Sequence, residues 1–502
     1  MSIDSESLDA VDGEDKTLID SNDEGSIEKP ELPKEPQQQD IKHNDNGKKH
    51  LDYEYPLKYT PISNRPVRKY KHRKFKSLFK PRQSYLDFER LMMGKNEFRG
   101  FFILFWVGLG FKTLITLYEF WKVNGSLISF EMISMVGEHG IDMLKSDLAM
   151  VLSTFTFVFF QKFIVYGIVP LKYASQLQHV IQAIWYLFYL VYCYTRPWGW
   201  IQKLYFVLHL TANLMKSYSY NSYNINLHYR LIRYHALQNQ SLVDIHISND
   251  LLTERDDLFL ELTTEHGGFF PSNLTFTNFI DFQLVPSLVY EIKFPRTEKF
   301  RLWYFMERLC SGIIAATFLF LTIQHSVMPV FDKLPQQSFI DSFLELIIPF
   351  MICWLLMFFL LFDCITNFFA EITCFADRQF YSDWWNSPTY DAFARDWNKP
   401  VHQFLLRHCY QESMTNLMLS KQEAMLLTFF ISSLVHELVV LMLGGKFRFY
   451  LFGMQMFQIP LIYISSLKMF KGYELAGNCF FWFGMYIGPP LMTVGYLREI
   501  YV

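Results

Sequence analysis

Long apolar runs, separated by polar stretches, fill most of the chain after residue 82. About nine of these runs approach the ~20 residues that a helix needs to cross a bilayer. Lipid offers no partner to an exposed backbone amide, so we expect each run to be a helix and the chain to be an all-α, polytopic membrane protein. The predicted spans cover roughly residues 98–121, 148–169, 180–194, 201–215, 310–323, 339–362, 424–443, 447–466 and 478–496.

The first 82 residues differ in composition from the rest of the chain. Residues 1–50 are rich in Asp and Glu and contain few apolar side chains, so we expect them to be disordered. Residues 51–82 are instead rich in Lys and Arg, and the near-neutral total charge of −3 hides these two opposed blocks. We therefore divide the chain into a disordered, acidic then basic region at 1–82 and a membrane domain at 83–502.

The basic block directly precedes the first predicted span and should stay in the cytosol together with the N-terminus. The segments 216–308 and 368–423 then also face the cytosol. The acidic N-terminus lacks the pattern of a cleaved signal peptide, so we expect the first span to direct insertion into a membrane of the secretory pathway. The seven cysteines are scattered singly, which predicts neither a disulfide framework nor a metal site.

The seventh predicted span carries the adjacent pair His436 and Glu437 deep within apolar sequence. Ionisable side chains are costly at this depth and are usually functional, although such a pair can also do no more than hydrogen-bond neighbouring helices. Adjacent helical residues point about 100° apart, so we expect the two side chains to have separate partners. Burial penalises the charged form of an imidazole, so His436 should be neutral and able to act as a general base.

A second group of polar residues lies among aromatic residues in the predicted cytosolic segment 368–423. It consists of Phe380-Tyr-Ser-Asp-Trp-Trp-Asn386 and Arg395-Asp-Trp-Asn-Lys-Pro-Val-His402. A purely structural interpretation is open for each part. The tryptophans are typical of an interfacial belt, Asn398 can cap a helix that runs through His408, and His402 can be an exposed residue of that helix's first turn.

The segment from Phe380 to Asn386 resembles the FYxDWWN motif of membrane-bound O-acyltransferases, and His436 resembles that family's intramembrane histidine. The stretch from Trp384 through His402 to His408 is similar to the sterol O-acyltransferase branch, particularly its fungal members. So are Phe294-Pro-Arg-Thr297 and Gln455-Met-Phe-Gln-Ile-Pro460. The resemblance runs from about Tyr85 to the C-terminus.

This resemblance implies a bundle of about nine helices around an internal tunnel in the endoplasmic reticulum membrane, where acyl-coenzyme A enters from the cytosol and sterol enters from the bilayer. It implies that His436 is the catalytic base and that Asn398 and His402 lie close to the thioester. It also implies that the FYxDWWN segment lines the coenzyme A mouth, where its residues either contact the coenzyme or brace the loop. The residues assigned to acyl-coenzyme A binding are Tyr381, Asp383, Trp384, Trp385 and Asn386.

The partners that follow from this interpretation are acyl-coenzyme A as co-substrate, a membrane sterol, the bilayer and further copies of the chain in a dimer or tetramer. No separate cofactor, metal or nucleic acid is expected. Three other functions stay open: acylation of diacylglycerol by an enzyme with the same motifs, acylation of a protein, and proton-coupled transport in which His436 and Glu437 form a relay.

Overall fold

The computed structural model describes residues 78–86, 99–127, 134, 137–243, 248–264, 267–465 and 473–501. All of them belong to the unit formed by residues 66–502. Most of the N-terminal region predicted to be disordered, residues 1–77, lies outside the described residues.

The described part of the chain is helical, and its extended pairings are three isolated β-bridges. The α-helices are α3 (Arg99–Asn124), α5 (Gly140–Ser153), α6 (Thr156–Val165), α7 (Leu171–Thr195), α8 (Trp200–Val243), α9 (Asn249–Leu262), α10 (Phe276–Leu284), α11 (Leu302–Thr322), α12 (Met328–Lys333), α13 (Phe339–Phe358), α14 (Thr366–Ile372), α15 (Tyr390–Asp396), α16 (Lys399–Phe404), α17 (Glu412–Asn416), α18 (Lys421–Gly444), α19 (Tyr450–Met456), α20 (Gln458–Ser465) and α21 (Glu474–Tyr501). Three segments are π-helical: η2 (Ile323–Val327), η3 (Phe359–Ile365) and η5 (Leu405–Gln411). The segment η4 (Trp384–Asn386) is a single 3₁₀ turn.

Five helical segments of the described part are long and apolar enough to cross a membrane, which confirms the prediction of a polytopic, all-helical protein. They coincide with the first, second, fifth, sixth and seventh predicted spans. Three further predicted spans lie within α7, α8 and α21. The five segments are Ile103–Asn124, Gly140–Val165, Leu302–Lys333, Phe339–Ile372 and Lys421–Gly444.

The predicted single helix at 447–466 is wrong, because the structure divides this run into α19 and α20. Pro460 explains the division. It has no amide proton to donate to the carbonyl one turn earlier, at Met456, and α19 ends at that residue. Two short helices therefore stand where the apolar run suggested one continuous helix.

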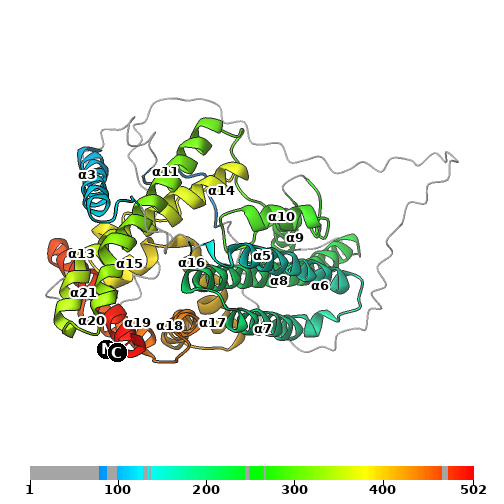
Figure 1. Cartoon of the computed structure of the whole chain (residues 1–502). Coiled ribbons are helices and arrows are strands. Elements are labelled where there is room, and N and C mark those ends of the chain that lie inside the picture. Colours follow the sequence, from blue (N-terminus) through cyan, green and yellow to red (C-terminus); the bar gives the residue numbers. More distant parts are fainter. Residues whose placement is uncertain are drawn as a thin grey trace. The chain divides into compact units, whose positions relative to one another are not determined.

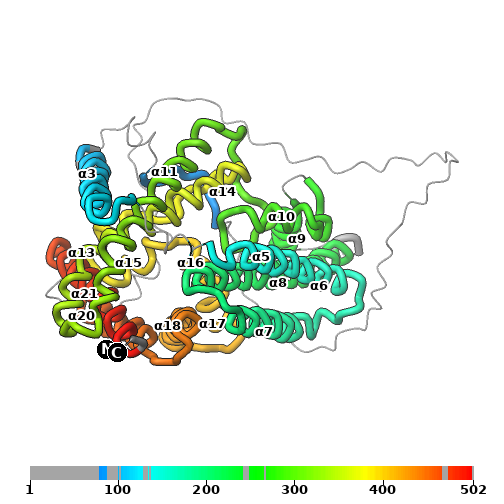
Figure 2. The backbone as a smooth tube through the Cα atoms, in the orientation of Figure 1, coloured from blue at the N-terminus to red at the C-terminus, as the bar shows by residue number. Residues whose placement is uncertain are grey.

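The helix that carries His436 touches elements from both ends of the chain. In one group, α5, α6 and α7 pack along the long helix α8, and in another α11 packs against α13, which packs against α21 (Figure 1). Helix α18 contacts α7 and α8 on one side and α19 on another, and α19 in turn contacts α21. The backbone trace in Figure 2 follows the same order, with α17 and α18 beside α7 and α8.

Local sequence sets both ends of α18. At its start Ser420 and Glu423 form a capping box, in which the Ser420 hydroxyl accepts from the Glu423 amide at 3.3 Å and the Glu423 carboxylate accepts from the Ser420 amide at 2.8 Å. At its end Gly445 adopts φ +68°, a conformation that glycine reaches without a steric penalty. The helix is thus fixed in register, and with it the position of His436.

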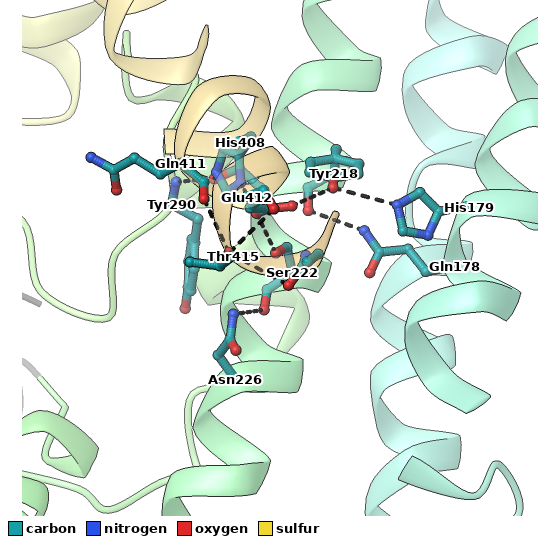
Figure 3. Close-up of polar contacts among 12 residues, drawn as sticks. Gln178, His179, Tyr218, Ser222, Asn226, Tyr290, His408, Gln411, Glu412 and Thr415 are labelled. Carbon is teal, nitrogen blue, oxygen red and sulfur yellow. Dashed lines mark hydrogen bonds and ion pairs between the residues drawn. The ribbon is translucent and has the colours of Figure 1, made fainter. Parts of the chain in front are cut away.

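A buried polar network fastens η5 and α17 to α8 (Figure 3). The His408 ring contacts the Glu412 carboxylate through Nδ1 at 2.7 Å and the Ser219 hydroxyl through Nε2 at 2.8 Å. Glu412 also accepts hydrogen bonds from the hydroxyls of Tyr218 at 2.6 Å and Ser222 at 3.0 Å. Since Ser219 is fully buried, this chain of contacts acts as a brace between helices rather than as an open site.

The surroundings of His408 favour the neutral ring. Burial lowers the pKa of His408 below its ordinary value of 6.5 and outweighs the opposite effect of Glu412. Burial alone would raise the pKa of Glu412, but hydrogen bonds from His408, Tyr218 and Ser222 outweigh it and lower that pKa. The folded protein therefore holds a neutral imidazole against a carboxylate.

We predict that acidification destabilises the protein through this brace. Because the folded-state pKa of His408 lies below 6.5, the unfolded chain binds more protons as the pH falls past that value, and stability is lost by at most about 1.4 kcal/mol per pH unit for one group. Thermal unfolding in detergent from pH 7.5 to 5 should show a shallower slope for His408→Gln than for the wild type. The exposed His235 provides a control, His235→Gln, whose slope should match the wild type. Equal slopes for all three proteins would contradict the prediction.

Candidate active site

The FYSDWWN segment forms a tight loop between α14 and α15 that ends in the 3₁₀ turn η4. Its side chains differ in how deeply they are buried. Tyr381 and Trp384 are each 1% exposed, whereas Asp383 and Asn386 lie open to solvent. The Asn386 amide approaches the Asp383 carboxylate at 3.5 Å. Two of the five residues predicted to bind acyl-coenzyme A are therefore in a position to meet a ligand directly, and two form part of the core.

Tyr381 is anchored by a buried carboxylate that the sequence analysis did not single out. Its hydroxyl donates to Asp363 Oδ1 at 2.7 Å, and the Ser84 hydroxyl donates to the same oxygen at 2.9 Å. Arg308 forms an ion pair with the other oxygen, and both charged side chains are at most 3% exposed. Arg308 and Asp363 lie in two candidate membrane spans, so this pair attaches the loop to the membrane helices.

Trp384 and Trp385 attach the other end of the loop. The Trp384 ring packs edge-on against Phe358, with ring centroids 4.9 Å apart, and against Phe393 at 5.9 Å. The Trp385 carbonyl accepts hydrogen bonds from Asn478 at 2.9 Å and from the Trp482 ring at 3.0 Å, both on α21. The ring contacts of Trp384 and the backbone carbonyl of Trp385 thus brace the loop.

Backbone hydrogen bonds join the FYSDWWN loop to the turn that carries Asn398. The Ser382 amide donates to the Asp396 carbonyl at 2.8 Å, and the Lys399 amide donates to the Phe380 carbonyl at 3.0 Å. The structure thus brings together two of the predicted groups of site residues, which the sequence separates by more than ten positions.

Asn398 caps α16, which confirms the capping interpretation. Its Oδ1 accepts from the Val401 amide at 3.2 Å, and Pro400 stands in the first turn as expected. The cap occupies the oxygen of the side-chain amide and fixes its orientation. Its Nδ2 group makes no hydrogen bond within the described residues, so the same side chain can cap the helix and donate to a ligand.

His402 lies one helical turn after Asn398, and its amide donates to the Asn398 carbonyl at 3.0 Å. Its side chain is partly buried. Burial lowers the pKa of His402, Arg395 and Lys399 lower it further, and Asp391 raises it. The ring is therefore neutral at pH 7.

His436 has a defined tautomer. Its Nδ1 lies 2.8 Å from the carbonyl oxygen of Ser432, one turn earlier on α18. A carbonyl only accepts, so Nδ1 carries the proton and Nε2 presents a free lone pair. The side chain is exposed although its neighbour Glu437 is fully buried.

Glu437 has partners of its own. Its carboxylate accepts from the amides of Phe449 at 2.7 Å and Phe452 at 3.0 Å, which lie at the start of α19, and from the Tyr496 hydroxyl at 3.0 Å. A carboxylate at a helix N-terminus is well placed to satisfy amides that the helix itself leaves unpaired. The expectation of separate partners for His436 and Glu437 is confirmed.

The two halves of the predicted site meet through helix packing. His436 forms no hydrogen bond with Asn398 or His402 among the described residues. However, α18 packs against η5, and η5 directly continues α16. Arg308 and Asp363 were missed by the sequence analysis, although both are ionisable residues next to or within apolar runs, the same signal that drew attention to His436.

Comparison with known proteins assigns the family. The sequence model of the MBOAT, membrane-bound O-acyltransferase family matches residues 205–498. The chain is 34% identical to "Probable sterol O-acyltransferase 1" of Schizosaccharomyces pombe over 84% of this chain and 86% of that protein. It is 30% identical to "Sterol O-acyltransferase 2" of Saccharomyces cerevisiae over 80% of this chain and 67% of that protein. It is 33% identical to "Diacylglycerol O-acyltransferase 1-2" of Oryza sativa subsp. japonica, but over only 46% of this chain and 50% of that protein.

The family match covers more than half of the chain and includes the FYSDWWN loop, the Asn398 turn and the His436 helix. The S. pombe relative extends the similarity over most of both proteins. The chain belongs to the membrane-bound O-acyltransferase family.

Proposed function

We propose that the protein is a sterol O-acyltransferase that moves a long-chain fatty acyl group from acyl-coenzyme A to the 3-hydroxyl of a membrane sterol. The observation that carries this choice is the similarity to sterol O-acyltransferases of two yeasts over at least 80% of the chain. The steryl ester formed would be a storage lipid.

The chemistry follows from the tautomer of His436. Its free Nε2 takes the proton of the sterol hydroxyl while the hydroxyl oxygen forms a bond to the thioester carbonyl carbon. The tetrahedral intermediate then collapses, the carbon–sulfur bond breaks, and the coenzyme A sulfur leaves with the proton that His436 returns. The transfer needs no acyl-enzyme, because the sterol oxygen attacks the thioester directly.

Asn398 and His402 act on the thioester in this proposal. The carbonyl oxygen gains negative charge as the alcohol attacks, and a hydrogen-bond donor at that point lowers the barrier. The Asn398 Nδ2 group is suited to this role because the helix cap uses only Oδ1. One oxyanion donor is worth about 3 kcal/mol in a dry site. The neutral ring of His402, one turn away, helps to hold the thioester.

Acyl-coenzyme A is a co-substrate, and the proposal includes no separate cofactor and no metal. Asp383 and Asn386 contact the coenzyme at the cytosolic mouth because they are the exposed members of the loop. Tyr381, Trp384 and Trp385 keep that loop in place through Asp363, the aromatic core and α21.

The proposed setting is the endoplasmic reticulum membrane, with the N-terminus in the cytosol and about nine spans around an internal tunnel. The exposed side chain of His436 on a membrane helix, with Nε2 free of hydrogen bonds among the described residues, supports the approach of a lipid alcohol to this residue. We also propose that the chain assembles as a dimer or tetramer.

Two rival functions have specific consequences. Acylation of diacylglycerol would use the same residues, but the diacylglycerol acyltransferase relative matches less than half of the chain. A proton-coupled transporter would need Glu437 to exchange protons with His436, whereas its carboxylate is committed to α19 and Tyr496.

The direct test supplies radiolabelled oleoyl-coenzyme A, with a sterol or with diacylglycerol, to membranes from a host that lacks both activities. We expect label in steryl ester and little in triacylglycerol. Replacing His436 by alanine should lower steryl ester formation by at least about 100-fold, because a positioned base contributes ~10²- to 10⁴-fold.

His235→Ala, on the exposed part of α8, is the matched control and should keep wild-type turnover. Preferred labelling of triacylglycerol would refute the sterol assignment. Near-normal turnover of inserted His436→Ala protein would refute the base assignment.

Substitutions at Asn398 separate capping from catalysis. Serine caps helices as well as asparagine does but has no amide donor, so Asn398→Ser should keep normal expression and lose about 100-fold in kcat. Asn398→Ala should lose both expression and kcat. If Asn398 only caps α16, the serine variant will turn over at the wild-type rate.

A substitution at Glu437 tests the transporter alternative. Glu437→Ala removes the acceptor for the amides of Arg448, Phe449 and Phe452 and for the Tyr496 hydroxyl, so we expect a loss of stability of about 3 kcal/mol, measured by thermal unfolding. The pH profile of ester formation by the protein that remains folded should be unchanged. A shifted profile, together with unchanged stability, would favour a proton relay.

A further inference from the structure

A cationic pocket lies outside the proposed active site. It has a volume of about 470 Å³ and is here named the basic pocket. Five of its lining residues are Lys or Arg, and one is acidic. The residues that line it are Pro81, Arg82, Gln83, Arg296, Thr297, Glu298, Lys299, Arg301, Ala376 and Arg378.

Three chain segments that are distant in sequence are joined to form this pocket. The Arg82 amide donates to the Ala376 carbonyl at 3.0 Å, and the Arg378 amide donates back to the Arg82 carbonyl at 2.8 Å. On the other side, the Ala376 amide donates to the Pro295 carbonyl at 2.9 Å and the Thr297 amide donates to the Cys374 carbonyl at 2.7 Å. The pocket walls are therefore set by main-chain hydrogen bonds rather than by side chains alone.

Carboxylates behind the wall hold the arginines in place. Asp377 binds Arg82 through both oxygens, at 2.9 and 2.6 Å. The fully buried Glu371 pairs with two arginines at once, Arg378 at 2.5 Å and Arg301 at 3.2 Å. Arg296 pairs with Asp281, and Glu298 also lines the pocket. Because Glu371 faces two guanidinium groups, the five cations exceed these four carboxylates by one positive charge.

One cationic group of the pocket is open to a ligand. Arg378 is 3% exposed and is held by Glu371 and by the Tyr304 ring, so it contributes positive charge from within the wall and not a free hydrogen-bond donor. Lys299 is exposed at the rim and forms no ion pair in the described part of the chain. The charge of the basic pocket is therefore suited to bind an anion.

The basic pocket lies beside the ends of two candidate membrane segments. One candidate span begins at Leu302, directly after Arg301, and another ends at Ile372, six residues before Arg378. Beside the pocket Leu302 and Trp303 are 64% and 85% exposed. A large exposed aromatic ring at the end of a span is typical of the headgroup region.

We propose that the basic pocket binds the phosphorylated headgroup of an anionic membrane phospholipid. Phosphate is the chemistry that clustered guanidinium and ammonium groups recognise. The position between the ends of two spans favours a headgroup over a free phosphate compound, because basic pockets between membrane helices are where anionic headgroups collect. The adjacent apolar residues Leu302 and Trp303 would contact the acyl chains of the same lipid.

The test uses the purified full-length protein in a neutral detergent and native mass spectrometry. The probes are dioctanoyl phosphatidylinositol 4-phosphate, dioctanoyl phosphatidylcholine as the neutral lipid, and coenzyme A and inorganic phosphate as free phosphate sources. We expect the inositol lipid to bind, phosphatidylcholine not to bind, and neither coenzyme A nor inorganic phosphate to displace the lipid.

Lys299→Glu should weaken binding of the inositol lipid by about tenfold or more, and Lys299→Gln by about fivefold, from ~1 kcal/mol per basic residue near an anionic headgroup. Lys333→Glu is the matched control, because Lys333 is an exposed lysine at the opposite end of the same span, and it should bind as the wild type does. Thermal unfolding confirms that each variant is folded.

Three results would overturn the proposal. The first is equal binding of the neutral and the anionic lipid. The second is unchanged affinity of the folded Lys299→Glu variant. The third is displacement of the lipid by coenzyme A with a parallel loss of coenzyme A affinity in Lys299→Glu, which would identify the basic pocket as a coenzyme phosphate site.

Discussion

The ion pair of Asp363 with Arg308 is the interaction on which the arrangement of the site depends. Neither charge has access to water, so each must be satisfied inside the protein. Besides its ion pair, Asp363 accepts hydrogen bonds from the hydroxyls of Tyr381 and Ser84. The bond from Tyr381 attaches the FYSDWWN loop to the two candidate membrane spans that carry Asp363 and Arg308. That loop then hydrogen-bonds to the Asn398 turn. The need to satisfy two buried charges therefore positions the loop that we propose as part of the substrate site.

A similar division of labour operates on α18. His436 is exposed and Glu437 is buried, because successive helical positions point in different directions. The Glu437 carboxylate accepts hydrogen bonds from the start of α19. The His436 Nδ1 bonds to a carbonyl of its own helix, which leaves Nε2 with a free lone pair. Glu437 fixes the start of α19, and His436 is the residue that we propose as the base.

Much of this could be predicted from the sequence, and the exceptions have physical reasons. Continuous apolar runs predicted the helices, and the spacing of Asn398 and Pro400 predicted the cap. The division of 447–466 was missed because hydropathy does not register the amide that Pro460 lacks. The inward direction of Tyr381 and Trp384 was also beyond reach, since it depends on Asp363 and Phe393, which are brought near only by folding. The basic pocket was missed for the same reason, because its cations come from three distant segments.

The central claim is that the free Nε2 of His436 takes the proton of the lipid alcohol. It is tested most directly by the rate of steryl ester formation when residue 436 is replaced by either isomer of methylhistidine. The account predicts no ester above background with the methyl group on Nε2. With the methyl group on Nδ1 it predicts a reduced but clear rate, because the ring must turn away from the Ser432 carbonyl but keeps the Nε2 lone pair. A substantial rate from the Nε2-methyl protein would contradict it.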